Sequence, residues 1–197
     1  MFPVVLNLAG RLVVVVGVGA VGTRKAAAAV AAGATVRIVD PVAVGVNVIS
    51  EAYRPEHLDG AFLVFACATP LVNAQVVADA HERGILANSA TDPNGGDFTL
   101  PSVVRSGELT LAISTGGAAP ALARRLREKF EAEFDSTFAE WLRLLADVRV
   151  IVLAEVPDPI RRRELLDDFA DWPWLERLRA EGSEIVKATM LETLRAG

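Results

Sequence analysis

The sequence is most informative at Gly17-Val18-Gly19-Ala20-Val21-Gly22. This stretch directly follows the apolar run Leu12 to Val16 and leads into the helix-forming residues Lys25 to Ala32. A strand, a glycine turn and a helix in this order are typical of a dinucleotide-binding α/β fold. In that fold the first glycine makes the tight turn, the second lets the backbone approach a pyrophosphate, and the third lets the helix pack on the strand. The helix N-terminus then faces the phosphates. The alternative is a strand-to-helix turn that is only steric.

The residue that ends the next apolar run supports a cofactor site. Asp40 closes the run Val36 to Val39, and a carboxylate there can accept hydrogen bonds from both hydroxyls of a ribose. The same carboxylate would repel a 2′-phosphate, so the sequence favours NAD over NADP. The predicted cofactor-binding residues are Gly17, Gly19, Ala20, Val21, Gly22, Asp40 and Pro41.

Composition limits the class of protein. The chain has 197 residues, of which 52% are hydrophobic, enough for one full domain and a smaller appendage. We expect a cytoplasmic protein, because no apolar stretch near the start is long enough for a membrane span or has a signal-peptide cleavage pattern. The single cysteine, Cys67, excludes an internal disulfide and predicts a small core residue. The net charge of −5 argues against nucleic acid as a general partner.

The order of apolar runs predicts a Rossmann-type, doubly wound parallel sheet in an α/β domain over residues 1–114. Helical stretches at Arg24 to Ala32 and Val72 to Arg83 separate the runs. Between Asp40 and the next plausible strand, Val46 to Tyr53, too few residues remain for a full helical crossover. The predicted strands are Leu12 to Val16, Val36 to Val39, Ala61 to Ala66, Ile85 to Ala87 and Leu109 to Ile113.

The remainder of the chain is predicted to be helical. Pro120 suits a first helical turn, and apolar residues follow at four-residue spacing as Leu122, Leu126, Phe130 and Phe134. We expect a helical dimerisation segment over residues 115–147 and a small helical domain over residues 148–197. The last helical region, Ile160 to Leu194, is interrupted by Trp172-Pro173-Trp174 and by Gly182.

Four stretches together resemble one family. They are Gly17 to Lys25, Leu58 to Val64, Asn88-Ser89-Ala90-Thr91-Asp92-Pro93, and Ile113 to Lys129 with its Ser114-Thr115-Gly116-Gly117. The chain resembles, over nearly its whole length, the precorrin-2 dehydrogenases of sirohaem synthesis, some of which are bifunctional. The resemblance implies NAD-dependent oxidation of precorrin-2 to sirohydrochlorin by a homodimer whose helix after Pro120 packs across a two-fold axis. In some members the same cleft also inserts ferrous iron.

Two departures from the family pattern concern the chemistry. The family has an Asp-Asp pair after the Asn, with the first Asp considered essential, and here that position is Thr91. A threonine hydroxyl cannot take a proton at neutral pH, so the predicted general base is Asp92, with Thr91 beside it as the second catalytic candidate. The alternative is that Asp92 belongs to a turn with no catalytic role. Where the family has Thr-Asp-Asp, this chain has Cys67-Ala68-Thr69, so iron insertion is less expected than oxidation.

Precorrin-2 carries many carboxylates, so its site requires arginines and backbone amides. The predicted substrate-binding residues are Ser114, Gly116, Gly117 and Arg124, at the start of the helix after Pro120. The alternatives are an ordinary capping loop and a solvated charged helix face. His57 and His81 have no second ligand at metal spacing, so no metal site is predicted.

Two other classes of function stay open on the sequence. The first is a non-catalytic NAD or tetrapyrrole carrier or sensor on the same fold, which the change at Thr91 keeps possible. The second is a nucleotide-sensing module without tetrapyrrole, which leaves Ser114 to Pro120 unexplained.

Overall fold

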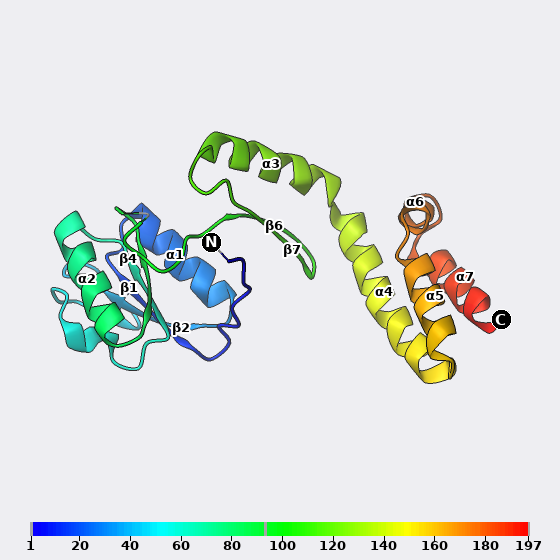
Figure 1. Cartoon of the computed structure of the whole chain (residues 1–197), viewed down its shortest axis with the longest axis horizontal. Helices are drawn as coiled ribbons and strands as arrows, with labels where there is room; N and C mark the ends of the chain where they lie inside the picture. The colour runs from blue at the N-terminus through cyan, green and yellow to red at the C-terminus, as the bar shows by residue number, and fades with distance from the viewer. Residues whose placement is uncertain (1, 93, 197) are drawn as a thin grey trace. The chain divides into compact units, whose positions relative to one another are not determined.

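The computed structural model describes residues 2–92 and 94–196 (Figure 1). Contacts divide the chain into two compact units, one ending at Leu100 and the other beginning at Pro101. The predicted first domain extends further, to residue 114. In the part of the chain that the structure describes, no helix has the length and apolarity needed to span a membrane.

The first unit contains a five-stranded sheet in the order β3-β2-β1-β4-β5, with all neighbouring strands parallel. This order confirms the predicted Rossmann-type fold. The strands are β1 (Leu12–Val16), β2 (Thr35–Val39), β3 (Val48–Ile49), β4 (Leu63–Ala66) and β5 (Leu86–Ser89). The helices are α1 (Ala20–Ala31), α2 (Pro70–Glu82) and a 3-10 turn, η1 (Pro55–Leu58).

Helices cover both faces of this sheet. In β1, Val13 and Val15 belong to a buried cluster with residues of α1, whereas Val14 and Val16 belong to a cluster with residues of α2. All four valines are at most 2% exposed. Burial on both faces explains why the β1 sequence is a continuous apolar run and does not alternate.

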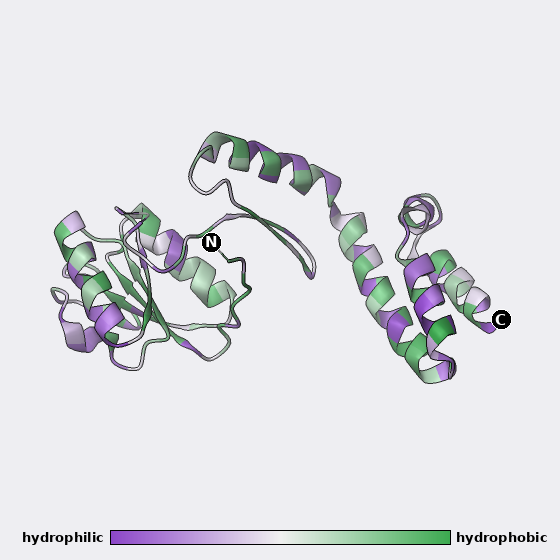
Figure 2. Ribbon diagram, in the orientation of Figure 1, coloured by the Kyte–Doolittle hydropathy of each residue, from purple (hydrophilic) through white to green (hydrophobic). Residues whose placement is uncertain are grey.

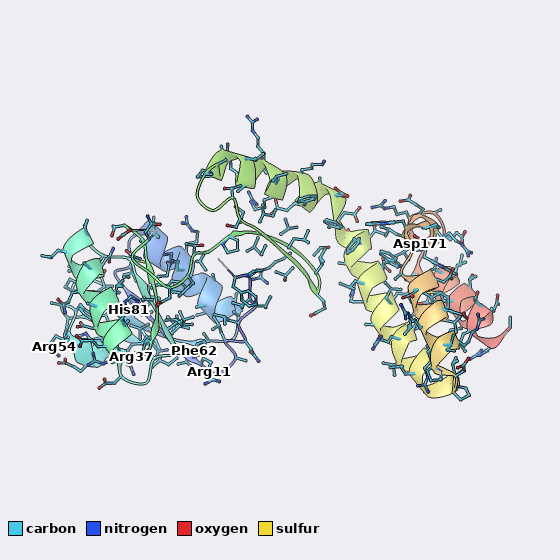
Figure 3. All side chains as sticks on the ribbon, viewed as in Figure 1. Arg11, Arg37, Arg54, Phe62, His81 and Asp171 are labelled. Atoms are coloured by element: carbon cyan, nitrogen blue, oxygen red, sulfur yellow. The ribbon has the colours of Figure 1, made fainter. Side chains whose placement is uncertain are left out.

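The connection from β2 to β3 is short, as the sequence predicted. It contains no helix, and Asn47 has a positive φ of 61° where the chain turns into β3. The amide of Ile38 donates to the carbonyl oxygen of Asn47 at 2.9 Å, which begins the β2–β3 pairing. At the amino end of the sheet, the Arg11 guanidinium lies over the Phe62 ring, 5.1 Å from its centroid; both residues are labelled in Figure 3.

One strand prediction was right about the strand and wrong about its sheet. Residues Leu109–Ile113 form β7, but β7 pairs antiparallel with β6 (Ser102–Ser106) in a separate two-stranded sheet of the second unit. The strands are joined through Gly107, whose φ is 56°. A short turn of this kind permits a hairpin, whereas a parallel neighbour needs a long crossover.

The rest of the second unit is helical, as predicted. Its helices are α3 (Pro120–Glu133), α4 (Ser136–Glu155), α5 (Pro159–Phe169), α6 (Trp172–Glu181) and α7 (Ser183–Arg195). Figure 2 shows hydrophobic and hydrophilic residues alternating along α3. α4 supplies Trp141, Leu144, Val148 and Val152 to a buried cluster with α5, α6 and α7. It also continues without a break through residue 148, the predicted start of the last domain.

Candidate functional site

The loop between β1 and α1 has the geometry of a phosphate-binding turn. Gly17 has a φ of 89°, and a Cβ added there would lie 2.7 Å from the backbone oxygen of Cys67. A Cβ on Gly22 would overlap the carbonyl oxygen of Gly17. At Gly19, by contrast, an added Cβ would meet nothing within 4 Å beyond its own chain neighbours. Packing therefore requires Gly17 and Gly22, whereas Gly19 faces open space at the N-terminus of α1, the position at which dinucleotide-binding folds of this kind hold a pyrophosphate.

Asp40 fixes the neighbouring loop by accepting backbone hydrogen bonds. Its Oδ2 accepts from the amide of Val18 at 3.0 Å, and its Oδ1 accepts from the amides of Val42 and Ala43, each at 3.0 Å. These bonds, first that from Val18 and then that from Val42, lower the pKa of the Asp40 carboxyl below its ordinary value. An ionised carboxylate oxygen accepts up to two bonds, so Oδ2 retains capacity for a ribose hydroxyl.

The other predicted cofactor residues lie beside this pair of loops. Ala20 and Val21 form the first turn of α1 with exposed side chains, and Pro41 is the exposed residue after Asp40. The sequence spacing placed all of them at the carboxyl ends of β1 and β2. Their contact with a cofactor stays a prediction.

Thr91 and Asp92 lie in the loop that follows β5. The Ser89 Oγ accepts from the amides of Thr91 and Asp92 at 3.4 and 3.1 Å. Both candidate catalytic residues are exposed, and the Asp92 Oδ1 accepts from the amide of Asn94 at 3.0 Å. The amide of Ala90 donates to the carbonyl oxygen of Ala66 at 2.9 Å, which holds this loop next to the end of β4. The turn considered above as the alternative for Asp92 includes Pro93, which lies outside the described residues.

A buried lysine connects α1 to the end of β5. The Lys25 Nζ donates to Asn88 Oδ1 at 2.5 Å and lies 5.3 Å from the centroid of the Phe65 ring. Burial lowers the pKa of Lys25 and raises the pKa of the Cys67 thiol, which fits the prediction that this cysteine is a packed residue and not a nucleophile.

Sequence reasoning assigned no role to Lys25, Asn73 or Asn88. A signal for Lys25 was present, because a lysine lies among the small residues of α1 that face the sheet, with Gly22, Ala26 and Ala29. The buried asparagines carried no such signal, since their partners are brought near only by the fold.

The predicted substrate-binding residues belong to the second unit. The amide of Gly116 donates to Ser114 Oγ at 3.2 Å, and Gly116 and Gly117 have φ values of 62° and 85°. The Arg124 Nε lies 4.0 Å from an oxygen of Glu128, one turn further along α3. This is the geometry of a solvated charged helix face, the alternative stated above. A role for these residues in substrate binding stays a prediction.

Neither histidine lies in a metal-like setting. The Nδ1 of His57 accepts from the amide of Arg54 at 3.1 Å, and the Nε2 of His81 lies 3.2 Å from an oxygen of Asp97 (His81 is labelled in Figure 3). Within residues 2–92 and 94–196 no group of three or more His, Cys, Asp or Glu side chains is placed to hold a metal ion.

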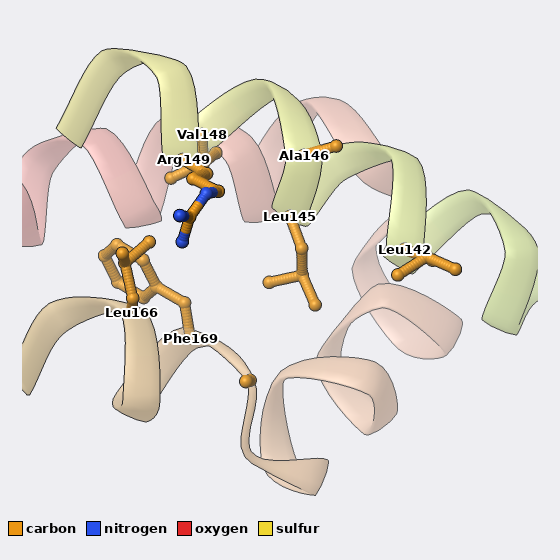
Figure 4. Close-up of a pocket in the computed structure, with 8 residues that line it drawn as sticks. Leu142, Leu145, Ala146, Val148, Arg149, Leu166 and Phe169 are labelled. Atoms are coloured by element: carbon orange, nitrogen blue, oxygen red, sulfur yellow. The ribbon is translucent and has the colours of Figure 1, made fainter. Parts of the chain in front are cut away.

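The second unit also has an open cavity of about 300 Å³ between α4 and α5 (Figure 4). None of the predicted site residues borders it. Its lining is apolar apart from one arginine and comprises Leu142, Leu145, Ala146, Val148, Arg149, Leu166, Phe169 and Ala170.

The strand order and the open glycine turn define the class of protein, a Rossmann-type dinucleotide-binding protein. Comparison with known proteins identifies the family. A family described as putative NAD(P)-binding matches residues 4–102, and one described as sirohaem biosynthesis protein central matches residues 106–133. The chain belongs to the putative NAD(P)-binding family, whose model covers half of its length. The match supports a nicotinamide cofactor and does not distinguish NAD from NADP.

Similar proteins agree with this assignment. The chain is 33% identical to a siroheme synthase of Azotobacter vinelandii and 35% identical to one of Gluconacetobacter diazotrophicus, over 99% and 100% of its own length. It spans only 44% and 45% of those proteins. Among solved structures it is similar to SirC, a precorrin-2 dehydrogenase, with 25% identity, a TM-score of 0.78 and full coverage of both chains.

Proposed function

We propose that this protein is a precorrin-2 dehydrogenase that uses NAD and forms sirohydrochlorin. The observation that carries the proposal is the full-length likeness to SirC, since it includes both the dinucleotide-binding fold and the helical region after it. The open space at Gly19 adds a local argument, because it is where the fold requires room for a pyrophosphate.

NAD is preferred to NADP in this proposal because of the loop after β2. Asp40 presents a carboxylate there, and residues 41–47 include no lysine or arginine to pair with a 2′-phosphate. The glycine turn, Ala20, Val21 and Pro41 would hold the rest of the dinucleotide. When bound, NAD supplies the acceptor for the hydride that leaves the macrocycle.

The protein's own contribution to the chemistry is a proton acceptor and an anion site. Asp92 takes the proton lost from the macrocycle, since its exposed carboxylate follows β5 at the edge where dinucleotides bind. The Ser114 to Gly117 turn and Arg124 bind substrate carboxylates through backbone amides and a guanidinium group. We further propose that the protein is a cytoplasmic homodimer in which the apolar residues of α3 meet their copies.

The test is multiple-turnover oxidation of precorrin-2 by the purified protein with NAD⁺ under anaerobic conditions. We expect stoichiometric formation of sirohydrochlorin and NADH. Asp92→Asn should lower kcat by about 10² or more, the usual contribution of a general base. The matched control is Asp167→Asn, since Asp167 is an exposed carboxylate of α5 that pairs with exposed Arg163.

One observation favours a second candidate function, a carrier or sensor of the tetrapyrrole. Thr91 stands where the family has its first aspartate, and its hydroxyl cannot act as a base. Binding of both NAD and precorrin-2 without turnover would contradict the dehydrogenase proposal and support this candidate.

A further inference from the structure

A buried amide joins the loops that follow β4 and β5. Asn73, in the first turns of α2, is 1% exposed. Its Oδ1 accepts from the amide of Ala68 at 2.8 Å, and its Nδ2 donates to the carbonyl oxygen of Ala68 at 3.3 Å and to Thr91 Oγ1 at 3.0 Å. All of its strong hydrogen-bonding groups are therefore engaged with these two loops.

The contacts of Asn73 fix the direction of its bond to Thr91. A backbone N–H only donates, so the side-chain atom facing the amide of Ala68 must be the oxygen, and the side chain cannot be flipped. The nitrogen then faces Thr91, and the Thr91 oxygen accepts. The hydrogen of the Thr91 hydroxyl consequently points elsewhere.

The Ser89 Oγ is too far away to accept an ordinary hydrogen bond from the Thr91 hydroxyl. The Ser89 Oγ lies 3.5 Å from Thr91 Oγ1, a weak contact beyond the usual range for a hydroxyl pair, and it accepts a shorter bond from the amide of Asp92 at 3.1 Å. Thr91 is exposed at the carboxyl end of β5. In this fold the dinucleotide crosses the sheet where the strand order reverses, here between β1 and β4, so its second half lies over β4 and β5.

We propose that Asn73 is a positioning residue that keeps the Thr91 hydroxyl as a hydrogen-bond donor toward an acceptor oxygen of the bound ligand. The inference rests on the proposed function and deepens it, because the family's aspartate at this position can only accept when ionised. The acceptor is a carboxamide or carboxylate oxygen, from the nicotinamide end of the cofactor or from the macrocycle.

The first experiment compares Thr91→Val with Thr91→Ser. Dissociation constants are measured for NADH alone and for precorrin-2 alone, and KM is measured for both substrates. Thr91→Val should lower the affinity for one of the two ligands by about three- to tenfold, the contribution of one neutral hydrogen bond. Thr91→Ser should retain that affinity, because serine keeps the hydroxyl. Weaker binding of NADH identifies the carboxamide oxygen of the cofactor as the acceptor. Weaker binding of precorrin-2 identifies a carboxylate oxygen of the macrocycle. Thr35→Val, at the exposed amino end of β2, is the matched control.

The second experiment reverses the bond. Asn73→Asp replaces the amide donor by a carboxylate oxygen, which accepts the hydrogen of the Thr91 hydroxyl. Binding of the same ligand should therefore weaken. Adding Thr91→Val to Asn73→Asp should cause little further loss of affinity. Unchanged binding and KM in Thr91→Val, or equal losses in Thr91→Val and Thr91→Ser, would overturn the inference. If Asn73→Asp does not fold, the Thr91 pair alone still decides. Absence of turnover in the unsubstituted protein would refute the dehydrogenase proposal, and the two binding titrations would still test the hydroxyl.

Discussion

At the residue scale, substitutions at two glycines of the turn after β1 should affect different properties, NAD affinity at Gly19 and stability at Gly22. Gly19→Asp should fold normally, because aspartate is a favourable N-cap and position 19 is open with a φ of −61°. Its carboxylate would repel the pyrophosphate, so NAD affinity should fall by about tenfold or more. Isothermal titration with NAD and a thermal unfolding curve measure the two effects.

The matched substitution is Gly22→Ala. Its methyl group would overlap the carbonyl oxygen of Gly17, so the variant should lose thermal stability even without ligand. Equal NAD affinity in Gly19→Asp and the unsubstituted protein would show that this turn does not bind the phosphates.

Asp40 leads to a prediction about acid stability. Backbone donors, the amide of Val18 first, hold the pKa of its carboxyl below the ordinary value of 3.8. A carboxyl pKa that is lowered in the folded state stabilises the protein at pH values above the pKa of the unfolded chain. This stabilisation is lost as pH falls through the pKa of the folded state. The free energy of unfolding should therefore be higher for the native protein than for Asp40→Asn at pH 7, and the difference should shrink below about pH 4. Urea titrations at several pH values measure it; a difference independent of pH would contradict this role for Asp40.

What the sequence predicted at this scale depended on distance along the chain. The spacing of Gly17, Gly22 and Asp40 is a local property of one strand-turn-helix-strand unit, so the sequence was sufficient to place them. Lys25 and Asn88 are 63 positions apart, and only the fold brings them together. A buried pair of this kind has no periodic signature.

At the scale of elements, a side-chain network centred on buried Asp79 connects the segment after β3 to α2. The hydroxyl of Tyr53 donates to Asp79 Oδ2 at 2.9 Å, and Gln75 Nε2 donates to the other oxygen at 2.8 Å. Asp79 is 6% exposed, so removing a donor leaves a buried carboxylate oxygen unsatisfied. Tyr53→Phe should lower the free energy of unfolding by about 1–3 kcal/mol in urea denaturation.

The same network predicts the titration of Tyr53, the one tyrosine of the sequence. Burial first, and then the bond to Asp79, raise its pKa above the ordinary value of 10.0. A pKa that is raised in the folded state contributes stability that is fully present below the pKa of the unfolded chain. This stability is lost as pH rises through the pKa of the folded state. Ultraviolet absorbance of the folded protein should show no tyrosinate at pH 10. Tyrosinate at that pH would contradict the network.

The strands show the limit of sequence patterns at this scale. Apolar runs predicted β1, β2, β4, β5 and β7, but a run of this kind identifies a strand without identifying its partner. β6 (Ser102–Ser106) was missed because its two valines lie between polar residues. Its existence depends on pairing with β7, which the turn at Gly107 makes possible.

At the scale of the whole molecule, each compact unit has buried clusters of its own. The sheet unit contains two, one on each face, and the helical unit contains one centred on α4. The sequence predicted a sheet domain followed by helices, because periodicity changes along the chain. It did not predict that the contacts divide at Leu100 and Pro101, since a hairpin has the same apolar pattern whichever unit it packs against.

Separate clusters predict separable stabilities. Phe169 is fully buried and meets the Trp174 ring edge-on at 5.4 Å between centroids, so Phe169→Ala should destabilise the helical unit by about 3–5 kcal/mol. NAD at about one hundred times its dissociation constant should stabilise the sheet unit by about 2.7 kcal/mol. In calorimetry, Phe169→Ala should lower one transition, NAD should raise the other, and NAD affinity at low temperature should be unchanged in the variant. A single transition that responds equally to both would show that the two units unfold together, because the loss in one cluster would then be transmitted to the other.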